Sequence, residues 1–115
     1  MKVNHFSGLI AWQKATELTL LVYSISSKLP TSERYGLINQ LRRAAVSVPS
    51  NIAEAFSRAG LKDKKHFHII ALGSLSELES QLLLCKQLGY LDETGLATLI
   101  DLITQTRKLI QSLKF

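Results

Sequence analysis

The chain has 115 residues, of which 46% are hydrophobic and 20% are charged, the composition of a globular protein and not of a disordered or fibrous one. Because that length is typical of one domain, we expect a single domain over residues 1–115. The single cysteine excludes an internal disulfide framework and a cysteine-based zinc site. No apolar run approaches the roughly 18 residues of a membrane span, and the first residues lack a signal-peptide core. We therefore expect a soluble, cytoplasmic protein with no membrane contact.

Apolar residues recur at steps of three and four in four segments, the spacing that keeps them on one face of an α-helix. The expected helices cover residues 9–28, 33–58 and 62–88, and a fourth follows the N-cap Asp92 to residue 113. Gly60 is expected to be a left-handed stop, and Gly89 ends the third helix. Helices of this length with short connections predict an all-α, antiparallel up-down-up-down four-helix bundle.

Pro49 lies inside the second segment, where a proline removes one backbone hydrogen bond and kinks or breaks a helix. A new helix capped by Ser47 is one alternative. The apolar phase continues across Pro49 without a slip, so we prefer one kinked helix. The carbonyl of Ala45 then lacks its usual amide donor and needs another partner. We expect a nearby polar side chain or an ordered water to supply it, the candidates being Ser47, Ser50 and Asn51.

The face of the third helix opposite its core stripe carries no charge. Its residues are Ile69, Leu72, Gly73, Ser76, Ser80, Leu83 and Leu84. The first helix is similarly apolar on a second side, around Leu20, Leu21 and Tyr23. A helix that is apolar on both sides is buried on both sides, whereas a monomeric bundle buries only one. We therefore favour self-association through these residues over the alternative of scattered surface apolar residues, which are common.

A mixed polar stripe lies opposite the core of the second helix and consists of Arg43, Ser47, Ser50, Glu54 and Arg58. Glu54 and Arg58 are four residues apart and can pair on one helix face. The stripe is either a solvated face, a polar seam between subunits or a phosphate-contacting edge. Glu77 of the third helix can reach this region, where it either pairs with Arg43 or stays separately solvated.

No catalytic motif supports an enzyme, because the chain lacks a phosphate-binding glycine loop, a nucleophile elbow and an HExxH pair. His66 and His68 are two residues apart and diverge on a helix, so they cannot share a metal. Cys85 falls in the core phase, where an inert buried thiol is expected. We expect no cofactor and no metal.

The net charge of +5 is compatible with a polyanionic partner, but many basic domains bind nothing charged, so its location matters. In the expected bundle, residues 1–13, 54–66 and 105–115 meet at one end. They carry a charge of +6, which leaves −1 for the rest of the chain. The basic residues are Lys2, Arg58, Lys62, Lys64, Lys65, Arg107, Lys108 and Lys114. Those of the fourth helix complement its dipole, whereas the lysines at residues 62–65 lie at a helix N-terminus, where cations are unfavourable. This placement favours a nucleic-acid site.

The most specific sequence motifs lie in the second and third expected helices. Residues 40–54 read Gln-Leu-Arg-Arg-Ala-Ala-Val-Ser-Val-Pro-Ser-Asn-Ile-Ala-Glu, and residues 71–79 read Ala-Leu-Gly-Ser-Leu-Ser-Glu-Leu-Glu. These strings resemble the bacterial four-helix-bundle family, also called the 23S ribosomal RNA intervening-sequence protein family. The likeness extends from Phe6 to Leu91, which is most of the chain.

The resemblance implies a bundle that assembles into a ring, typically a pentamer. Members are often encoded in insertions within large-subunit ribosomal RNA genes. Distant relatives are accessory proteins of diversity-generating retroelements, in which a basic pentamer binds a reverse transcriptase and nucleic acid. The chain departs from the family where Ala55-Phe56-Ser57-Arg58 replaces the usual Gly-x-Gly-Arg after Glu54. Lys64 also stands where an aromatic residue is usual, and Leu72 where a polar or basic one is usual.

Two classes of function remain open. One is a non-enzymatic ring protein associated with nucleic acid, such as ribosomal RNA or its own intervening sequence. The other is an accessory module that binds a protein, such as a reverse transcriptase, and whose basic end assists without specific recognition. Ring closure requires a heterologous contact, so we expect the third helix of one copy to meet the first helix of the next.

Overall fold

The computed structural model describes residues 3–114, which form four α-helices and two short 3-10 helices and contain no strand. In chain order these elements are η1 (Phe6–Gly8), α1 (Ile10–Ser26), η2 (Thr31–Glu33), α2 (Leu37–Ser57), α3 (Leu61–Gln87) and α4 (Glu93–Gln111). The all-α fold with four helices is confirmed, with boundaries within about one turn of those expected from periodicity.

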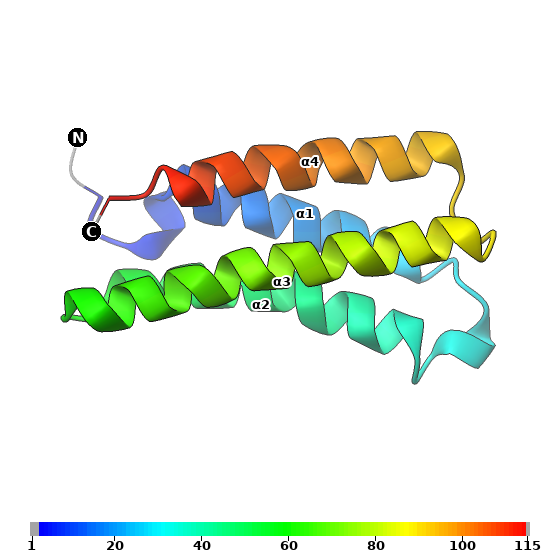
Figure 1. Ribbon diagram of the computed structural model, residues 1–115, viewed down its shortest axis with the longest axis horizontal. Helices are drawn as coiled ribbons and strands as arrows, with labels where there is room; N and C mark the ends of the chain where they lie inside the picture. Colours follow the sequence, from blue (N-terminus) through cyan, green and yellow to red (C-terminus); the bar gives the residue numbers. More distant parts are fainter. Residues whose placement is uncertain (1–2, 115) are drawn as a thin grey trace.

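The four helices lie side by side along the long axis of a molecule that measures 43 × 25 × 18 Å (Figure 1). η1, the α2–α3 connection and the end of α4 lie together, and we call this the terminal end (Figure 1). The α1–α2 and α3–α4 connections lie at the opposite end, which we call the far end. The lysine-rich start of α3 and the end of α4, which are distant in sequence, therefore lie at the same end of the bundle.

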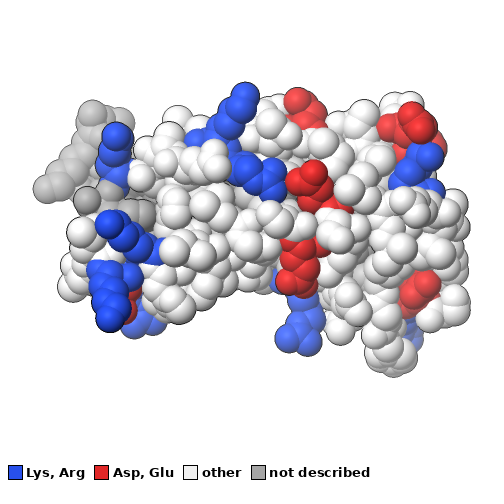
Figure 2. Space-filling view, in the orientation of Figure 1, with Lys and Arg blue, Asp and Glu red and all other residues white. Residues whose placement is uncertain are grey.

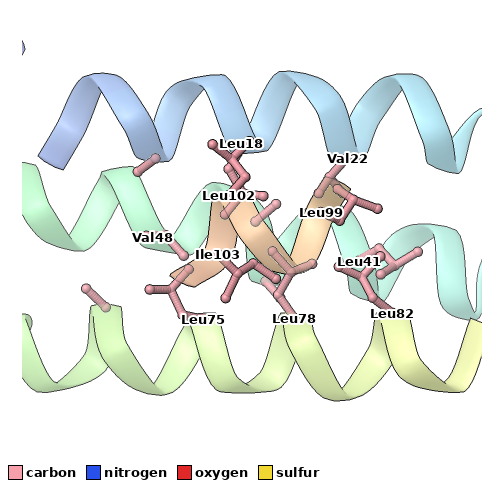
Figure 3. Close-up of a cluster of buried hydrophobic side chains, with 14 of the residues drawn as sticks. Leu18, Val22, Leu41, Val48, Leu75, Leu78, Leu82, Leu99, Leu102 and Ile103 are labelled. Carbon is pink, nitrogen blue, oxygen red and sulfur yellow. The ribbon is translucent and has the colours of Figure 1, made fainter. Parts of the chain in front are cut away.

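One core runs through the bundle, because α1 and α3 each pack against both α2 and α4. The expected apolar stripes supply it, and Figure 3 shows its central residues pointing toward one another. Leu18 of α1, Leu41 and Val48 of α2, Leu75 and Leu78 of α3, and Leu99 and Ile103 of α4 are almost fully buried. Side chains at this spacing occupy the inward face of each helix, so the opposite faces stay outside the core.

Helix α2 continues through Pro49, as the unbroken apolar phase predicts. The partner of the Ala45 carbonyl is Thr19 of α1, whose Oγ1 lies 3.0 Å from Ala45 O and 2.8 Å from Ala15 O. The expected donors were therefore wrong: the Asn51 amide donates instead to Ser47, at 2.7 Å to its carbonyl oxygen and 2.9 Å to its Oγ. A neighbouring helix thus supplies the donor that the proline removes.

The ends of the helices follow the capping expectations in part. Asp92 caps α4, since its Oδ1 accepts a hydrogen bond of 2.7 Å from the Gly95 amide. Gly89 has φ of +82° and provides the left-handed turn that ends α3. Gly60 does not, because its backbone is extended with φ −85° and ψ 142°, and the turn expected there was wrong. The α2–α3 connection reverses without a left-handed residue.

The far end is closed by side-chain contacts between its own segments. The Tyr90 hydroxyl donates to Glu33 Oε2 at 3.0 Å, and this hydrogen bond, with partial burial, raises the pKa of Tyr90. Arg42 of α2 donates to Ser26 Oγ at 2.9 Å and lies over the Tyr23 ring of α1. These contacts join the α3–α4 connection to the α1–α2 connection, and α2 to the end of α1.

The Thr19 contact can be tested by removing its hydroxyl at nearly constant shape. Thr19→Val should lower the free energy of unfolding by about 1–2 kcal/mol in urea titrations, because a buried carbonyl loses its partner. In a Pro49→Ala background residue 49 regains an amide that can donate to Ala45, so the same change should cost measurably less. Equal costs in the two backgrounds would contradict the assigned role.

Candidate functional site

Four lysines of the terminal end are exposed: Lys62 and Lys65 on the first turn of α3, Lys108 on the last turn of α4, and Lys114 beyond it. Within residues 3–114 no hydrogen bond or ion pair involves their ammonium groups. Lys2, also expected here, lies outside the described residues. On the face shown in Figure 2, Lys and Arg predominate at this end, whereas most acidic side chains lie toward the middle and the far end.

Lys64 has a structural task. Its Nζ donates to the carbonyl oxygens of Ala55 at 3.1 Å and Phe56 at 3.0 Å, in the last turn of α2. A cation at the negative end of a helix dipole is favourable, and here it also satisfies carbonyls that have no intrahelical donor. The expectation that all three lysines at residues 62–65 lack a structural reason was therefore wrong for Lys64.

The two arginines that were expected at the site are held by other residues. Arg58 pairs with Glu54 at 2.9 Å, as the spacing predicts, and its guanidinium lies 4.8 Å from the centre of the Phe67 ring. Arg107 of α4 lies 3.3 Å from both Glu79 and Ser76 of α3. The ion pair with Glu79 and the hydrogen bond to Ser76 connect α4 to α3 along the side of the bundle. Within residues 3–114, the positive charges of the terminal end that have no partner are therefore those of the four lysines.

The outer face of α3 is exposed, as the sequence predicts. We define the α3 outer stripe as Ile69, Gly73, Ser76, Ser80, Leu83 and Leu84, all of which are exposed. Ile69 exposes 66% of its surface, and Leu20 on α1 exposes 67%. Two other expected interface residues, Leu21 and Leu72, are only partly exposed because they pack against the bundle's own core. Tyr23 is 41% exposed, and one side of its ring is covered by Arg42.

The polar stripe of α2 forms a hydrogen-bonded cluster with α3. Ser47 Oγ receives the Asn51 amide and lies 2.8 Å from the hydroxyl of Ser74, a largely buried residue of α3. Sequence reasoning missed Ser74, although its position beside the core stripe of α3 was a usable signal. Glu77 accepts a hydrogen bond of 3.2 Å from Gln81 on its own helix. No Arg43–Glu77 ion pair is present among the described residues, and Arg43 is exposed to solvent.

Burial favours the neutral forms of two titratable groups, Cys85 and His68. Burial raises the pKa of the Cys85 thiol, with a smaller contribution from the charge of Glu33. Burial lowers the pKa of His68, so that its imidazole is uncharged at neutral pH. In the part of the chain that the structure describes, no three His, Cys, Asp or Glu side chains are placed to hold a metal ion. No helix among these residues has the length and apolarity to cross a membrane.

The two roles of the lysines predict different effects on stability. Lys64→Ala should lower the free energy of unfolding by about 1–2 kcal/mol, since two carbonyls at the end of α2 lose a charged donor. Lys62→Ala and Lys65→Ala, one or two residues away, should change it by less than about 0.5 kcal/mol. Chemical unfolding of the three single variants would measure both. A cost shared equally by all three would contradict the capping role of Lys64.

Comparison with known proteins gives one family. The family model described as 23S rRNA-intervening sequence protein matches residues 7–112, which include all four helices. No curated protein matches the chain significantly.

Proposed function

The chain belongs to the 23S rRNA-intervening sequence protein family, and we propose that it is a non-enzymatic, homo-oligomeric protein that binds RNA through its terminal end. The observation that carries this proposal is the set of four exposed lysines, Lys62, Lys65, Lys108 and Lys114, whose charges have no partner within residues 3–114. Lysines that neutralise phosphates release counterions from the nucleic acid, and this release supplies affinity independent of sequence. The family name makes ribosomal RNA or its intervening sequence the first candidate.

Self-association strengthens the same site. The connections at alternating ends in Figure 1 support an antiparallel up-down-up-down bundle, in which the α3 outer stripe and the Leu20 side of α1 point away from the core. Exposed apolar residues such as Ile69, Leu83 and Leu20 favour an interface. Two different patches that meet head to tail generate a ring when the rotation between copies closes. In a ring of parallel subunits, a pentamer for example, the terminal ends share one rim. Their lysines then act together on one polyanion.

A second candidate is an accessory protein that binds a partner protein such as a reverse transcriptase. The α3 outer stripe favours it, because an exposed apolar stripe serves a foreign protein as well as a second copy. In that case the terminal end contributes only weak, non-specific affinity for nucleic acid. The two experiments below separate these candidates.

RNA binding should depend on the four lysines. Replacing Lys62, Lys65, Lys108 and Lys114 by alanine should weaken binding of any single-stranded RNA in fluorescence anisotropy titrations. Each lost phosphate contact should flatten the slope of log K against log salt by about 0.7. The matched control replaces Lys28 and Arg34, two exposed cations of the α1–α2 connection at the far end. If the four-lysine variant keeps the wild-type salt slope, or if the control loses as much RNA affinity as the four-lysine variant, the terminal end is not the RNA-binding site.

Self-association should depend on the α3 outer stripe. The wild type should have a mass several times the 12.8 kDa of one chain in light scattering. Leu83→Glu together with Ile69→Glu should reduce it toward 12.8 kDa, because two charges are placed in an apolar contact. Tyr35→Glu, which changes the most exposed aromatic residue of the far end, is the control and should keep the wild-type mass. A double variant that keeps the wild-type mass would exclude α3 from the interface.

A further inference from the structure

An apolar hollow of about 340 Å³ opens at the terminal end. Its walls come from segments that are distant in sequence: Val3 and Leu9 at the start of the chain, Ile52 and Phe56 near the end of α2, and Leu113 after α4. Two lysines, Lys64 and Lys114, complete the lining. Ligand sites in proteins have this volume and this composition, with a mainly apolar wall and few polar groups.

The two lysines of the lining differ in what their charges can do. Lys64 Nζ donates to Ala55 O and Phe56 O, so that charge is spent on the end of α2 while the rest of the side chain lines the hollow. Lys114 is exposed and has no ion-pair partner among the described residues. Lys62 and Lys65, near the start of α3, are exposed at the same end of the bundle but do not line the hollow. A ligand in the hollow therefore has an apolar wall around it and one exposed cation, Lys114, in that wall.

We propose that this hollow receives one unstacked base of a single-stranded or bulged RNA, a proposal that rests on RNA binding by the terminal end. A nucleotide within a strand has a flat apolar base and an anionic phosphate on each side of it. That pattern matches an apolar hollow with the exposed Lys114 in its lining and further exposed lysines, Lys62 and Lys65, at the same end of the bundle. Phe56 supplies an aromatic ring for the base, the contact that single-strand-binding proteins use without regard to sequence.

The proposal predicts a preference for unpaired RNA. A paired base is stacked inside the duplex and reaches a pocket only after unpairing and unstacking, whereas a single strand offers its bases directly. The duplex still presents phosphates to the lysines. The hollow therefore adds affinity for single strands on top of a charge-dependent affinity that both forms share.

The test is a pair of anisotropy titrations with one labelled RNA oligonucleotide, single-stranded and annealed to its complement. Phe56→Leu keeps the hollow apolar but removes the ring, and it should weaken single-strand binding about tenfold while leaving duplex binding unchanged. Leu113→Trp places a larger side chain in the hollow from outside α4 and should give the same selective loss. Thermal melting by circular dichroism shows whether each variant is folded. If Phe56→Leu does not fold, Leu113→Trp provides the test. The control variant, with Lys62 and Lys65 replaced by alanine, should bind both single-stranded and duplex RNA more weakly.

The outcomes separate the two proposals. If the wild type binds both RNA forms equally and the hollow variants bind like it, the base-binding hollow is wrong while RNA binding by the terminal end stands. If the wild type binds neither form, both are wrong. Displacement of a fluorescent fatty acid from the hollow by oleate, with single-strand binding unchanged in Phe56→Leu, would assign the hollow to an amphiphile and overturn the proposal.

Discussion

Four helices that share one core can each bury only one stripe, and this constraint decides what the rest of the molecule exposes. Leu18, Leu75 and Ile103 fill the shared core, so the back of every helix must face solvent or a partner. On α2 that back is polar, with Arg43 and Glu54 exposed and Ser47 hydrogen-bonded to Ser74 of α3. On α3 it is uncharged from Ile69 to Leu84 apart from Glu77 and Glu79 at its edges. The surface that a single bundle leaves uncovered is therefore apolar on one helix in particular.

The two ends of the bundle differ in how many of their charges have partners within residues 3–114. At the far end Arg42, Glu33 and Tyr90 all hydrogen-bond to neighbouring segments and hold the connections in place. At the terminal end Lys64 serves the end of α2 in the same way. The other lysines of that end have no such use within residues 3–114. Like charges near one another repel, so a bound anion would relieve the repulsion within this set.

The sequence predicts much of the fold, because hydrophobic periodicity reports which side of each helix is buried. It correctly predicts four helices and one continuous α2 across Pro49, since the apolar phase does not slip there. It does not predict that Thr19 supplies the donor for Ala45. Periodicity shows which face of α1 is buried, but not which residue of α2 each α1 residue lies beside. Of the two alternatives for Glu77, the ion pair with Arg43 is absent among the described residues, and Glu77 accepts a hydrogen bond from Gln81 instead.

The site was harder to predict than the fold, because long side chains reach across elements. Lys64 and Lys65 are neighbours in sequence, yet one caps α2 and the other is exposed to solvent. Arg107 was assigned to the terminal end by its sequence position, but contacts with Ser76 and Glu79 hold it on the side of the bundle. The apolar hollow could not be found from sequence, since its walls come from several separate segments.

The most direct test of RNA binding at the terminal end is photochemical crosslinking of the wild-type protein to RNA, followed by mass spectrometry of the crosslinked peptides. Crosslinks should concentrate in peptides that cover residues 55–66 and 107–114, with Phe56 and the neighbouring lysines among the modified positions. Crosslinks confined to the far end, around Tyr35 and Tyr90, or to the α3 outer stripe would contradict the account.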